Sequence, residues 1–589
     1  MITHTDLQVE IGGNLTQGCM SLQLSQPIHG HHYFQARFSG EGLENDPLGL
    51  GSDSLNQIGQ TFKTELSNNA GESSNFSGII TSVRAIASGL SGQGQIIVFE
   101  GYSPTILLEN GQSCQSYVNM SLSDIISKAC QGPATNLLKL SVNPSNDPKL
   151  TYIVQYNETA FEFANRMARR FGEWLYYDGS EMIVGDKKQS ETTLTYGLDL
   201  QSFDLVMQSS SVIRQFTAHT YSGNQTQNIN TKSVQPNISG IGKQVYNSAS
   251  KTWPAPQNGI LMHFDEGDSL KKQLDDVAKT AVEGAAANQV LVNGASTNPA
   301  LHAGAAIKIM GFDTRDYGSY IVTAVNHQYI VGGNYHNTFT AVPSDVKASP
   351  YTNPALTPRC ESQAGVVEDN NDPDNLGRVK VRLYWQKDSV TPWLRIASPY
   401  GGSNKGIYFI PETGEEVMVG FEGGNAEMPY VQGTLYHSDA KPDDWKSNTN
   451  DIKAIRTRSG HTIEFCDQSG NESIVIKDSK GNMIQLDTVS GNLMISAPEN
   501  ISFSAKNIDI SASESISIGA RDNLSIHAGE DFTLAAKNTT TQAEESAHLS
   551  AKKIDQNANK IRIDSTKDPL ELASGKTVDL QSNEKVRLF

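Results

Sequence analysis

Towards its C-terminal end the chain carries apolar residues in pairs of the form apolar-x-apolar, with Ser, Gly, Asp and Lys between the pairs. Side chains at i and i+2 lie on one face of a β-strand, so each pair predicts one short strand followed by a polar corner. The interval between pairs shortens from nine residues to about eight, which indicates an internal repeat. The pairs before a polar interruption at 539–548 are Ile484/Leu486, Leu493/Ile495, Ile501/Phe503, Ile508/Ile510, Ile516/Ile518, Leu524/Ile526 and Phe532/Leu534. The pairs after it are Ile561/Ile563, Leu570/Leu572, Val578/Leu580 and Val586/Leu588.

A strand that presents only two apolar side chains cannot form a core alone. Either one chain coils on itself as a solenoid, or several chains wind round a common axis. A self-coiled solenoid needs roughly 18–25 residues per turn and larger apolar sets, so the repeat favours an intertwined triple-stranded β-helix, a needle, over 455–589. The residues predicted to form its dry core are Ile501, Phe503, Ile508, Ile510, Ile516, Ile518, Leu524, Ile526, Phe532 and Leu534.

The region 1–343 predicts β-barrel domains with a few helices. Runs such as LQVEI, YFQARFSG and QIIVFEGYS predict strands over 1–120. The predicted helices are 121–131, 158–172 and 269–288. Ser121 is the expected N-cap of the first helix, and Gly172 is expected to end the second.

Prolines at every fourth position make 344–358 unable to support helix or sheet, which predicts a linker. Five alternating strands are predicted within 359–440, a length that suits a small barrel of the oligonucleotide/oligosaccharide-binding (OB) type. A connector at 441–454 leads to the repeats. The predicted fold class is therefore mostly β with minor α, in several domains.

A net charge of −18 without a dense basic patch argues against nucleic acid as a partner. The N-terminus lacks the pattern of a signal peptide, and no run of about 18 apolar residues occurs, so we expect a cytosolic protein without stable membrane insertion. The cysteines, five in number and scattered, predict neither a disulfide framework nor a zinc site.

Three groups of residues are candidate sites. His31 and His32 are adjacent, and adjacent strand residues face opposite ways, so a metal site is not expected. The acidic stretch 368–377 lacks the flanking helices and twelfth-position glutamate of a calcium loop, which favours a hairpin turn. The barrel aromatics are Tyr384, Trp385, Trp393, Tyr400, Tyr408 and Phe409. Without a basic groove, packing in the core or between chains is favoured over a stacking platform for them.

No G-x-S-x-G, H-E-x-x-H or P-loop motif occurs. About fifteen residues separate the predicted barrel from the repeats, too few for a glycosidase domain with paired carboxylates. We therefore expect no catalytic, cofactor-binding or metal-binding residues.

The barrel and the segment after it resemble a known family. The motifs are GRVKV at 377–381, WLR at 393–395, IP at 410–411 with GEEV at 414–417, Pro429 with Gly433, and RTRSGH at 456–461. Together they resemble the valine-glycine repeat protein G (VgrG) spikes of type VI secretion systems and the hub and spike of contractile phage tails. The region before the linker resembles the hub of such spikes more loosely, and the repeats depart from the Val-x-Val-Gly pattern of the namesake.

The resemblance implies a homotrimer with a hub ring, an OB-fold collar and a triple-stranded β-helix. It further implies an inner-tube (Hcp-like) ring, baseplate proteins and effector toxins as partners. Such a spike punctures a target envelope mechanically, and it is assembled in the cytoplasm before it is secreted or injected.

A tip surface is also expected. Val586, Leu588 and Phe589 of three chains would gather at one end, and the resemblance supplies a tip protein of the proline-alanine-alanine-arginine repeat (PAAR) type as its partner. The alternatives are a spike of a phage or extracellular contractile particle, a trimeric β-helical adhesin, and a spike bearing a cell-wall hydrolase. A hub with a GRVKV collar argues against the adhesin.

Overall fold

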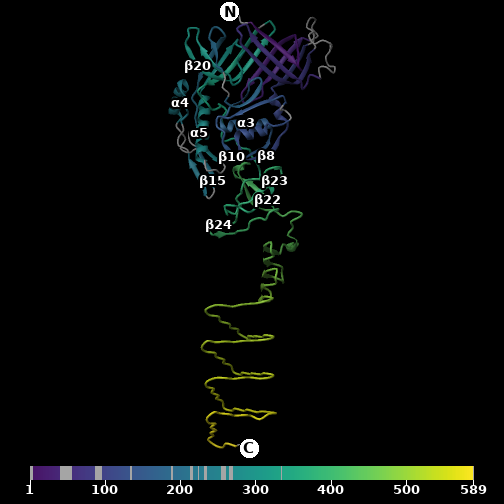
Figure 1. The fold of residues 1–589 in the computed structure, drawn as a ribbon, viewed down its shortest axis with the longest axis vertical. Coiled ribbons are helices and arrows are strands. Elements are labelled where there is room, and N and C mark those ends of the chain that lie inside the picture. Colours follow the sequence, from purple (N-terminus) through teal and green to yellow (C-terminus); the bar gives the residue numbers. More distant parts are fainter. Residues whose placement is uncertain are drawn as a thin grey trace. The chain divides into compact units, whose positions relative to one another are not determined.

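The computed structural model describes residues 4–587, apart from 40–55, 87–95, 133–135, 187–189, 213–215, 223–224, 231–234, 254–259, 264–269 and 333. The chain separates into two compact units, Met1–Asn450 and Asp451–Phe589 (Figure 1). Strands dominate, with a few helices in the first unit, so the predicted fold class is confirmed.

The first unit contains a 13-stranded sheet. Its strands are β1 (Thr5–Ile11), β2 (Asn14–Leu15), β3 (Cys19–Pro27), β4 (Tyr33–Ser39), β5 (Thr61–Asn68), β6 (Ser73–Ile86), β7 (Ile96–Tyr102), β13 (Thr192–Thr195), β14 (Leu200–Met207), β18 (Val290–Ser296), β19 (Ala306–Met310), β20 (Asp316–Ile330) and β21 (Asn334–Pro343). The order is β14-β18-β21-β20-β3-β4-β7-β6-β5-β1-β2, with β19 on β20 and β13 on β19. The pairing of β20 with β3 joins strands some 300 residues apart in the sequence into one sheet.

Alternation of apolar and polar residues explains why these segments form strands. In β5, Phe62 and Leu66 are buried, whereas Lys63 and Glu65, which lie between them in the sequence, are exposed. The Phe62 ring stacks on the ring of Phe34 in β4, with centroids 4.1 Å apart. Each strand of this kind gives one face to the core and the other to solvent.

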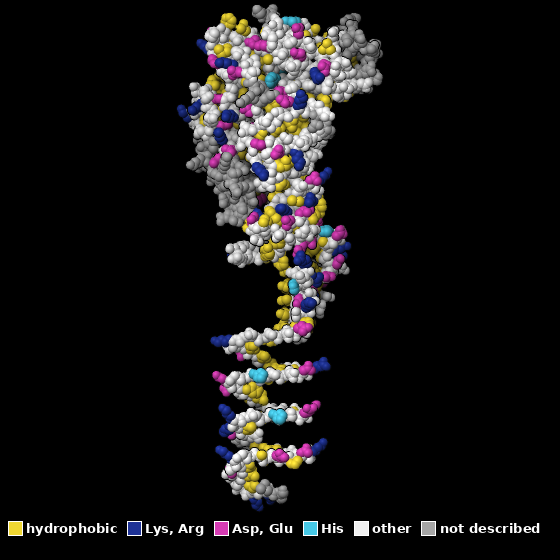
Figure 2. Space-filling model, viewed as in Figure 1, with side chains coloured by type: hydrophobic (Ala, Val, Ile, Leu, Met, Phe, Trp, Pro, Cys, Tyr) yellow, Lys and Arg dark blue, Asp and Glu magenta, His cyan; other side chains and the backbone are white. Residues whose placement is uncertain are grey.

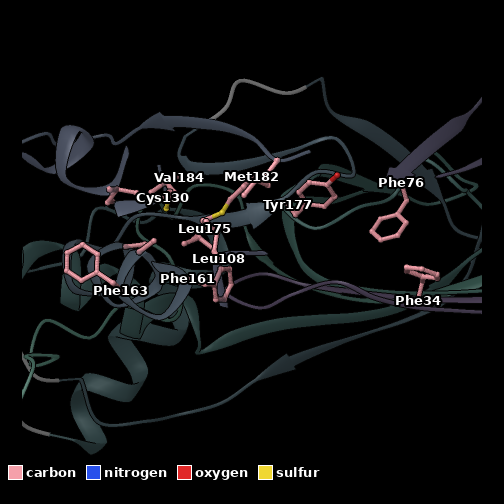
Figure 3. Packing of buried hydrophobic residues seen from close by; sticks show 14 of the residues in the cluster. Phe34, Phe76, Leu108, Cys130, Phe161, Phe163, Leu175, Tyr177, Met182 and Val184 are labelled. Atoms are coloured by element: carbon pink, nitrogen blue, oxygen red, sulfur yellow. The ribbon is translucent and has the colours of Figure 1, made fainter. Parts of the chain in front are cut away.

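A second layer covers part of the sheet. It consists of β8 (Ser113–Ser121) paired with β10 (Lys149–Glu158), the sheet of β9 (Lys139–Asn143), β12 (Glu181–Gly185) and β11 (Leu175–Tyr177), helices α2 (Leu122–Ala129) and α3 (Ala160–Phe171), and the 3-10 helix η2 (Pro104–Glu109). One hydrophobic core joins both layers (Figure 3). Its labelled members are Phe34, Phe76, Leu108, Cys130, Phe161, Phe163, Leu175, Tyr177, Met182 and Val184.

The ends of α2 and α3 confirm two predicted helices. The Ser121 side chain accepts a hydrogen bond from the Asp124 backbone N–H (3.1 Å). Thr159 and Glu162 form a capping box at the start of α3. Gly172 ends α3 at φ 75°, in the left-handed region that glycine adopts without a Cβ penalty.

The third predicted helix is confirmed as α5 (Leu270–Ala287). A further helix, α4 (Gly240–Thr252), was not predicted, since its sequence GIGKQVYNSASKT contains two glycines and few apolar residues. Tyr246 of α4 packs in a small hydrophobic core with residues of α5. Ala249 of α4 is also buried. The remaining strands here are β15 (Phe216–Ser222), β16 (Gln225–Asn230) and β17 (Ile260–His263).

Residues 344–358 contain no helix or strand, but they do not form a free linker. They run along the first unit as a strap. The Ser349 N–H donates to the Gly172 carbonyl (2.9 Å), and the Trp174 indole N–H donates to the Lys347 carbonyl (2.8 Å). The prolines prevented regular structure without preventing packing.

The OB domain follows the strap. Its sheet has the order β23-β22-β26-β27, with β22 (Gln363–Asp369), β23 (Lys380–Leu383), β26 (Glu416–Phe421) and β27 (Pro429–Thr434). Single bridges from Leu394 to Val379 and from Ile396 to Val431 add a fifth strand segment between the two edges. Shorter elements are β24 (Gly401–Gly402), β25 (Lys405–Gly406), η4 (Glu422–Gly424) and η5 (Asp443–Trp445).

The second unit begins with a five-stranded antiparallel meander of β28 (Ile452–Arg456), β29 (Thr462–Cys466), β30 (Ser473–Lys477), β31 (Met483–Asp487) and β32 (Asn492–Ser496). The pairs Ile484/Leu486 and Leu493/Ile495 therefore lie opposite each other in one hairpin of this chain. Their longer, nine-residue interval leaves room for a turn containing Gly491 (φ 71°). The needle-type repeat starts only after Ser496.

Candidate functional site

The repeats after Ser496 pair with no other strand among the residues that the structure describes. Across the described residues 497–587 there is no strand pair and no backbone–backbone hydrogen bond. Figure 1 draws this part as an open yellow-green ribbon that turns at regular corners. Holding a residue in one backbone conformation costs about 1–2 kcal/mol of chain entropy, and here no bond within the chain offsets that cost. The backbone N–H and C=O groups of these described residues are therefore open to pairing with other strands.

The corners are bends of the chain, and they keep the same position relative to the repeat throughout. They end at residues 499, 506, 514, 522, 530, 537, 545, 552, 559, 568, 576 and 584. Every apolar pair from Ile501/Phe503 onward occupies the second and fourth positions after a corner. The polar interruption at 539–548 therefore changes the side chains of the repeat but does not break the repeat itself.

The ten residues predicted to form the needle core all lie on this strip. In the single chain their exposed fractions range from 48% for Ile501 to 73% for Phe503 and Ile510. Figure 2 shows hydrophobic side chains open to solvent along these repeats. A soluble protein rarely leaves so long an apolar strip uncovered, so the strip marks an interaction surface.

One residue of the predicted tip surface is described. Val586 follows the last corner and is half exposed. Leu588 and Phe589 lie outside the described residues.

Within the first unit, four charged residues connect the hub-like layer to the OB domain. Glu427, in the turn before β27, has a side chain only 3% exposed and forms ion pairs with Arg166 and Arg170 of α3. Arg166 also binds Glu158 through two hydrogen bonds, of 2.6 and 2.8 Å. We call these four residues the joint.

The charges of the joint balance. Two arginines face two glutamates, and the side chains of both arginines are about nine-tenths buried. Burial lowers the pKa of Arg166, but its bonds to Glu158 and Glu427 outweigh burial and raise the pKa. The Arg166 guanidinium therefore remains charged. Removing a carboxylate from the joint would leave a buried positive charge without its partner.

Neutral contacts extend the joint. The Gln386 side-chain amide of the OB domain donates to the Ser116 hydroxyl (2.7 Å) and to the Tyr152 hydroxyl (3.2 Å). Tyr152 and Val154 of β10 share a hydrophobic cluster with Val381 and its neighbours in the OB barrel. Polar and apolar contacts therefore both cross the boundary between these two domains.

The two histidines make separate contacts. His31 bonds Thr105 (2.8 Å) and Glu109 (3.0 Å). His32 is fully buried beside Phe76 and Tyr177, and burial lowers its pKa to about 3. In the part of the chain that the structure describes, no three potential metal-binding side chains are grouped.

The acidic stretch 368–377 forms the predicted hairpin turn between β22 and β23. Its centre is Asp372, which accepts two hydrogen bonds from the Arg378 guanidinium, of 2.8 and 3.0 Å. Arg378 is the arginine of the GRVKV motif, so that residue has a structural role here. The same contact holds the pKa of Asp372 well below its usual range.

The barrel aromatics divide into two groups. Trp385 and Trp393 are half-buried, and the Trp385 indole N–H donates to the Gln363 side chain (2.9 Å). The other four are exposed in this chain: Tyr384 by 68%, Tyr400 by 57%, Tyr408 by 79% and Phe409 by 59%. Core packing was wrong for those four, and contact between chains remains a prediction.

The sequence patterns did not predict the joint. Arg166 and Arg170 are four residues apart on a predicted helix, so helical periodicity already puts them on one face. Their partner Glu427 is 257 residues from Arg170, and nothing in the sequence connects the two.

Two family models match the chain. Residues 50–332 match the phage tail baseplate hub (GPD) family, and residues 363–436 match the type VI secretion system/phage-baseplate injector OB domain. Together the two matches span more than half of the chain.

Curated relatives agree with these matches. The chain is 24% identical over 406 residues to the type VI secretion system spike protein VgrG5 of Pseudomonas aeruginosa, covering 62% of this chain and 50% of that protein. It is 21% identical over 468 residues to VgrG1b of the same organism, covering 73% of this chain and 62% of that protein. The chain thus spans about half to three-fifths of the length of these relatives.

A solved structure shares the fold. The Francisella PdpA-VgrG complex, in its half-lidded form, aligns with a TM-score of 0.51 at 10% identity, covering 84% of this chain and 88% of the matched chain. Among the helices of the described residues, none has the length and apolar character needed to span a membrane.

Proposed function

We propose, from the similarity of this chain to type VI secretion spikes and phage baseplate hubs, that three copies form the spike of a contractile injection system. In this proposal the spike caps the inner tube and punctures the target envelope to deliver effectors. The domains would be a hub over 1–343, a strap at 344–358, a collar over 359–440, a connector at 441–454 and the meander and needle over 455–589.

The unpaired repeats are the observation that carries this proposal. A strip of apolar pairs with open strand edges needs neighbours that supply both apolar contact and hydrogen bonds. Other copies of the same strip supply both, because equivalent chains present the same period. Three chains winding round one axis place the apolar pairs inside and the polar corners outside.

Such a needle would be stiff. Each repeat advances the axis by about 4.8 Å, so the twelve repeats would extend it by roughly 60 Å. Its backbone amides would be paired between chains, which resists bending and unfolding. The buried ion pairs of the joint fit the same role, since force applied at the hub would have to reach the needle without the collar rotating.

The mass in solution tests the trimer. Three copies of 63.9 kDa give about 190 kDa by light scattering. A stable, folded monomer of 64 kDa would refute the proposal, because the described part of the chain supplies no strand that pairs with the repeats.

Catalysis has no place in this function. Puncture is mechanical, and we expect the purified protein to hydrolyse neither peptidoglycan nor lipid. Hydrolysis that a point substitution in this chain abolishes would instead favour an enzyme-bearing spike.

The partners follow from the family. We expect an inner-tube (Hcp-like) ring and baseplate proteins at the hub, effector toxins as cargo, assembly in the cytoplasm and then injection. We further propose that Val586, Leu588 and Phe589 bind a tip protein of the PAAR type. Deleting Lys585–Phe589 should leave the trimer intact and abolish co-purification of that protein; unchanged recovery would place the tip-binding surface elsewhere.

A particle of phage or extracellular origin is the second candidate, because both family models include phage baseplate proteins. Imaging of the particle that contains this spike, in cells or in the medium, distinguishes the two.

A further inference from the structure

The segment without apolar pairs still has corners. Counting from each corner identifies the residues that stand where an apolar pair stands in the other repeats, which we call the inward positions. The pairs occupy the second and fourth positions after each corner, and the corners continue at 537, 545 and 552. The inward pairs of these three repeats are therefore Thr539/Thr541, Ala547/Leu549 and Ile554/Gln556.

The exposed fractions agree with this phase. Among the ten predicted core residues the first member of each pair is less exposed than the second, as with Ile508 at 53% and Ile510 at 73%. Leu549, assigned as a second member, is 73% exposed, and Ile554, assigned as a first member, is 49% exposed. The middle of the strip therefore turns two threonines and one glutamine towards the side that elsewhere carries Ile, Leu and Phe.

These three residues differ from the rest of the strip in what they require when buried. A buried hydroxyl or amide needs a hydrogen-bond partner, and an unpartnered one costs free energy. In three chains related by a threefold axis, equivalent residues lie at one height, so three Gln556 amides meet one another. Each amide carries donors and an acceptor, so the three can bond in a ring.

A shifted alignment loses those bonds. If one chain moves by one repeat, Ile and Leu pairs still meet Ile and Leu pairs, and the apolar strip hardly distinguishes the two alignments. Gln556 then faces Leu549 or Ile563 of the other chains, and its amide is left without a partner. A single buried polar position is known to select register and oligomeric state in this way, at some cost in stability.

We infer that Thr539, Thr541 and Gln556 form polar layers inside the interface between copies of this chain and set the register in which the three strips align. The inference rests on the proposed trimer, which it deepens. The partner that fits this surface is a second and third copy at the same height.

Cysteine cross-linking in the full chain tests the register. Ile563→Cys places one thiol per chain on the inward side, where equivalent thiols meet only in register. Mild oxidation should link about two of every three chains in this reporter, compared with the background of the native cysteines in the unsubstituted chain. Adding Thr539→Val, Thr541→Val and Gln556→Leu should reduce the linked fraction at least twofold while the mass stays trimeric.

The matched control changes the outward neighbours. Thr540→Val with Gln542→Leu introduces the same residue types on the other face and should leave the linked fraction unchanged. Full cross-linking in the triple variant, or an equal loss in the control, would overturn the register role. A reporter that is trimeric but never cross-links would show that the inward assignment is wrong, whereas a monomeric parent would refute the proposed function itself.

Discussion

Replacing Glu427 by glutamine removes the carboxylate that Arg166 and Arg170 share at the joint. Arg166 keeps its two hydrogen bonds to Glu158, whereas Arg170 loses the charge that balances its own. The side chain of Arg170 is only 9% exposed, so water cannot take the place of the missing carboxylate. The variant leaves an uncompensated buried charge between the hub and the collar.

The expected cost follows from that burial. Breaking a buried ion pair by removing one partner destabilises a protein by about 3–5 kcal/mol. The lower end applies here, since glutamine keeps one oxygen that can accept from Arg170. A loss of about 3 kcal/mol corresponds to a roughly 100-fold increase in the population of the opened joint.

Hydrogen exchange of the full-length chain measures that opening. Peptides covering α3 and β27 should exchange about 100-fold faster in Glu427→Gln, while peptides from β3 and β4 should not change. Removing both charges with Arg170→Met and Glu427→Leu should restore slow exchange, because a buried ion pair can be replaced by apolar residues at little cost.

Glu422→Gln is the matched control. Glu422 lies close to Glu427 in the sequence and pairs with Arg395, but the side chains of Glu422 and Arg395 are 25% and 39% exposed. Such pairs contribute about 0–1 kcal/mol, so exchange should rise less than about fivefold. Equal effects from the two glutamine variants would refute the reasoning that burial makes the joint important.

Three further predictions concern other parts of the chain. Ile518→Asp should abolish the trimer or its heat resistance by placing carboxylates on a dry axis, whereas Ser517→Asp should be mild; equal effects would mean that the strip faces outward. Burial lowers the pKa of His29 to about 4, below its unfolded value of about 6.5, so the unfolded chain binds the extra proton. The free energy of unfolding should therefore have its full value above about pH 6.5 and fall by up to about 3 kcal/mol towards pH 4. Because His29 bonds the Ser349 hydroxyl of the strap (2.8 Å), the loss should appear as faster hydrogen exchange of the strap, and it should be absent in His29→Gln. Asp372→Asn should expose the hairpin 368–377 to protease at pH 7; in the parent, that protection should weaken only below about pH 4, since the pKa of Asp372 is lowered. Cleavage that starts near pH 6 would contradict this role of Asp372.

The sequence alone determined the local structure well. Ser121, Thr159 and Gly172 mark helix ends through bonds to residues a few positions away, and such bonds depend little on the rest of the fold. The repeat was equally visible, because a period of about eight residues shows in the order of residues. Its apolar pairs already indicated that other chains must cover it.

Contacts between distant segments appeared only in the tertiary structure. No pattern announces that β20 pairs with β3, that Glu427 meets Arg170, or that the proline-rich strap packs against Gly172. The inward positions around the polar segment 539–548 could also be assigned only from the corners in the structure, because threonine and glutamine do not continue the apolar pattern of the sequence. The period of apolar residues reflects the local strand or helix in which each residue lies. The partner of a buried charge or of an open strand edge depends instead on how distant parts of the chain come together.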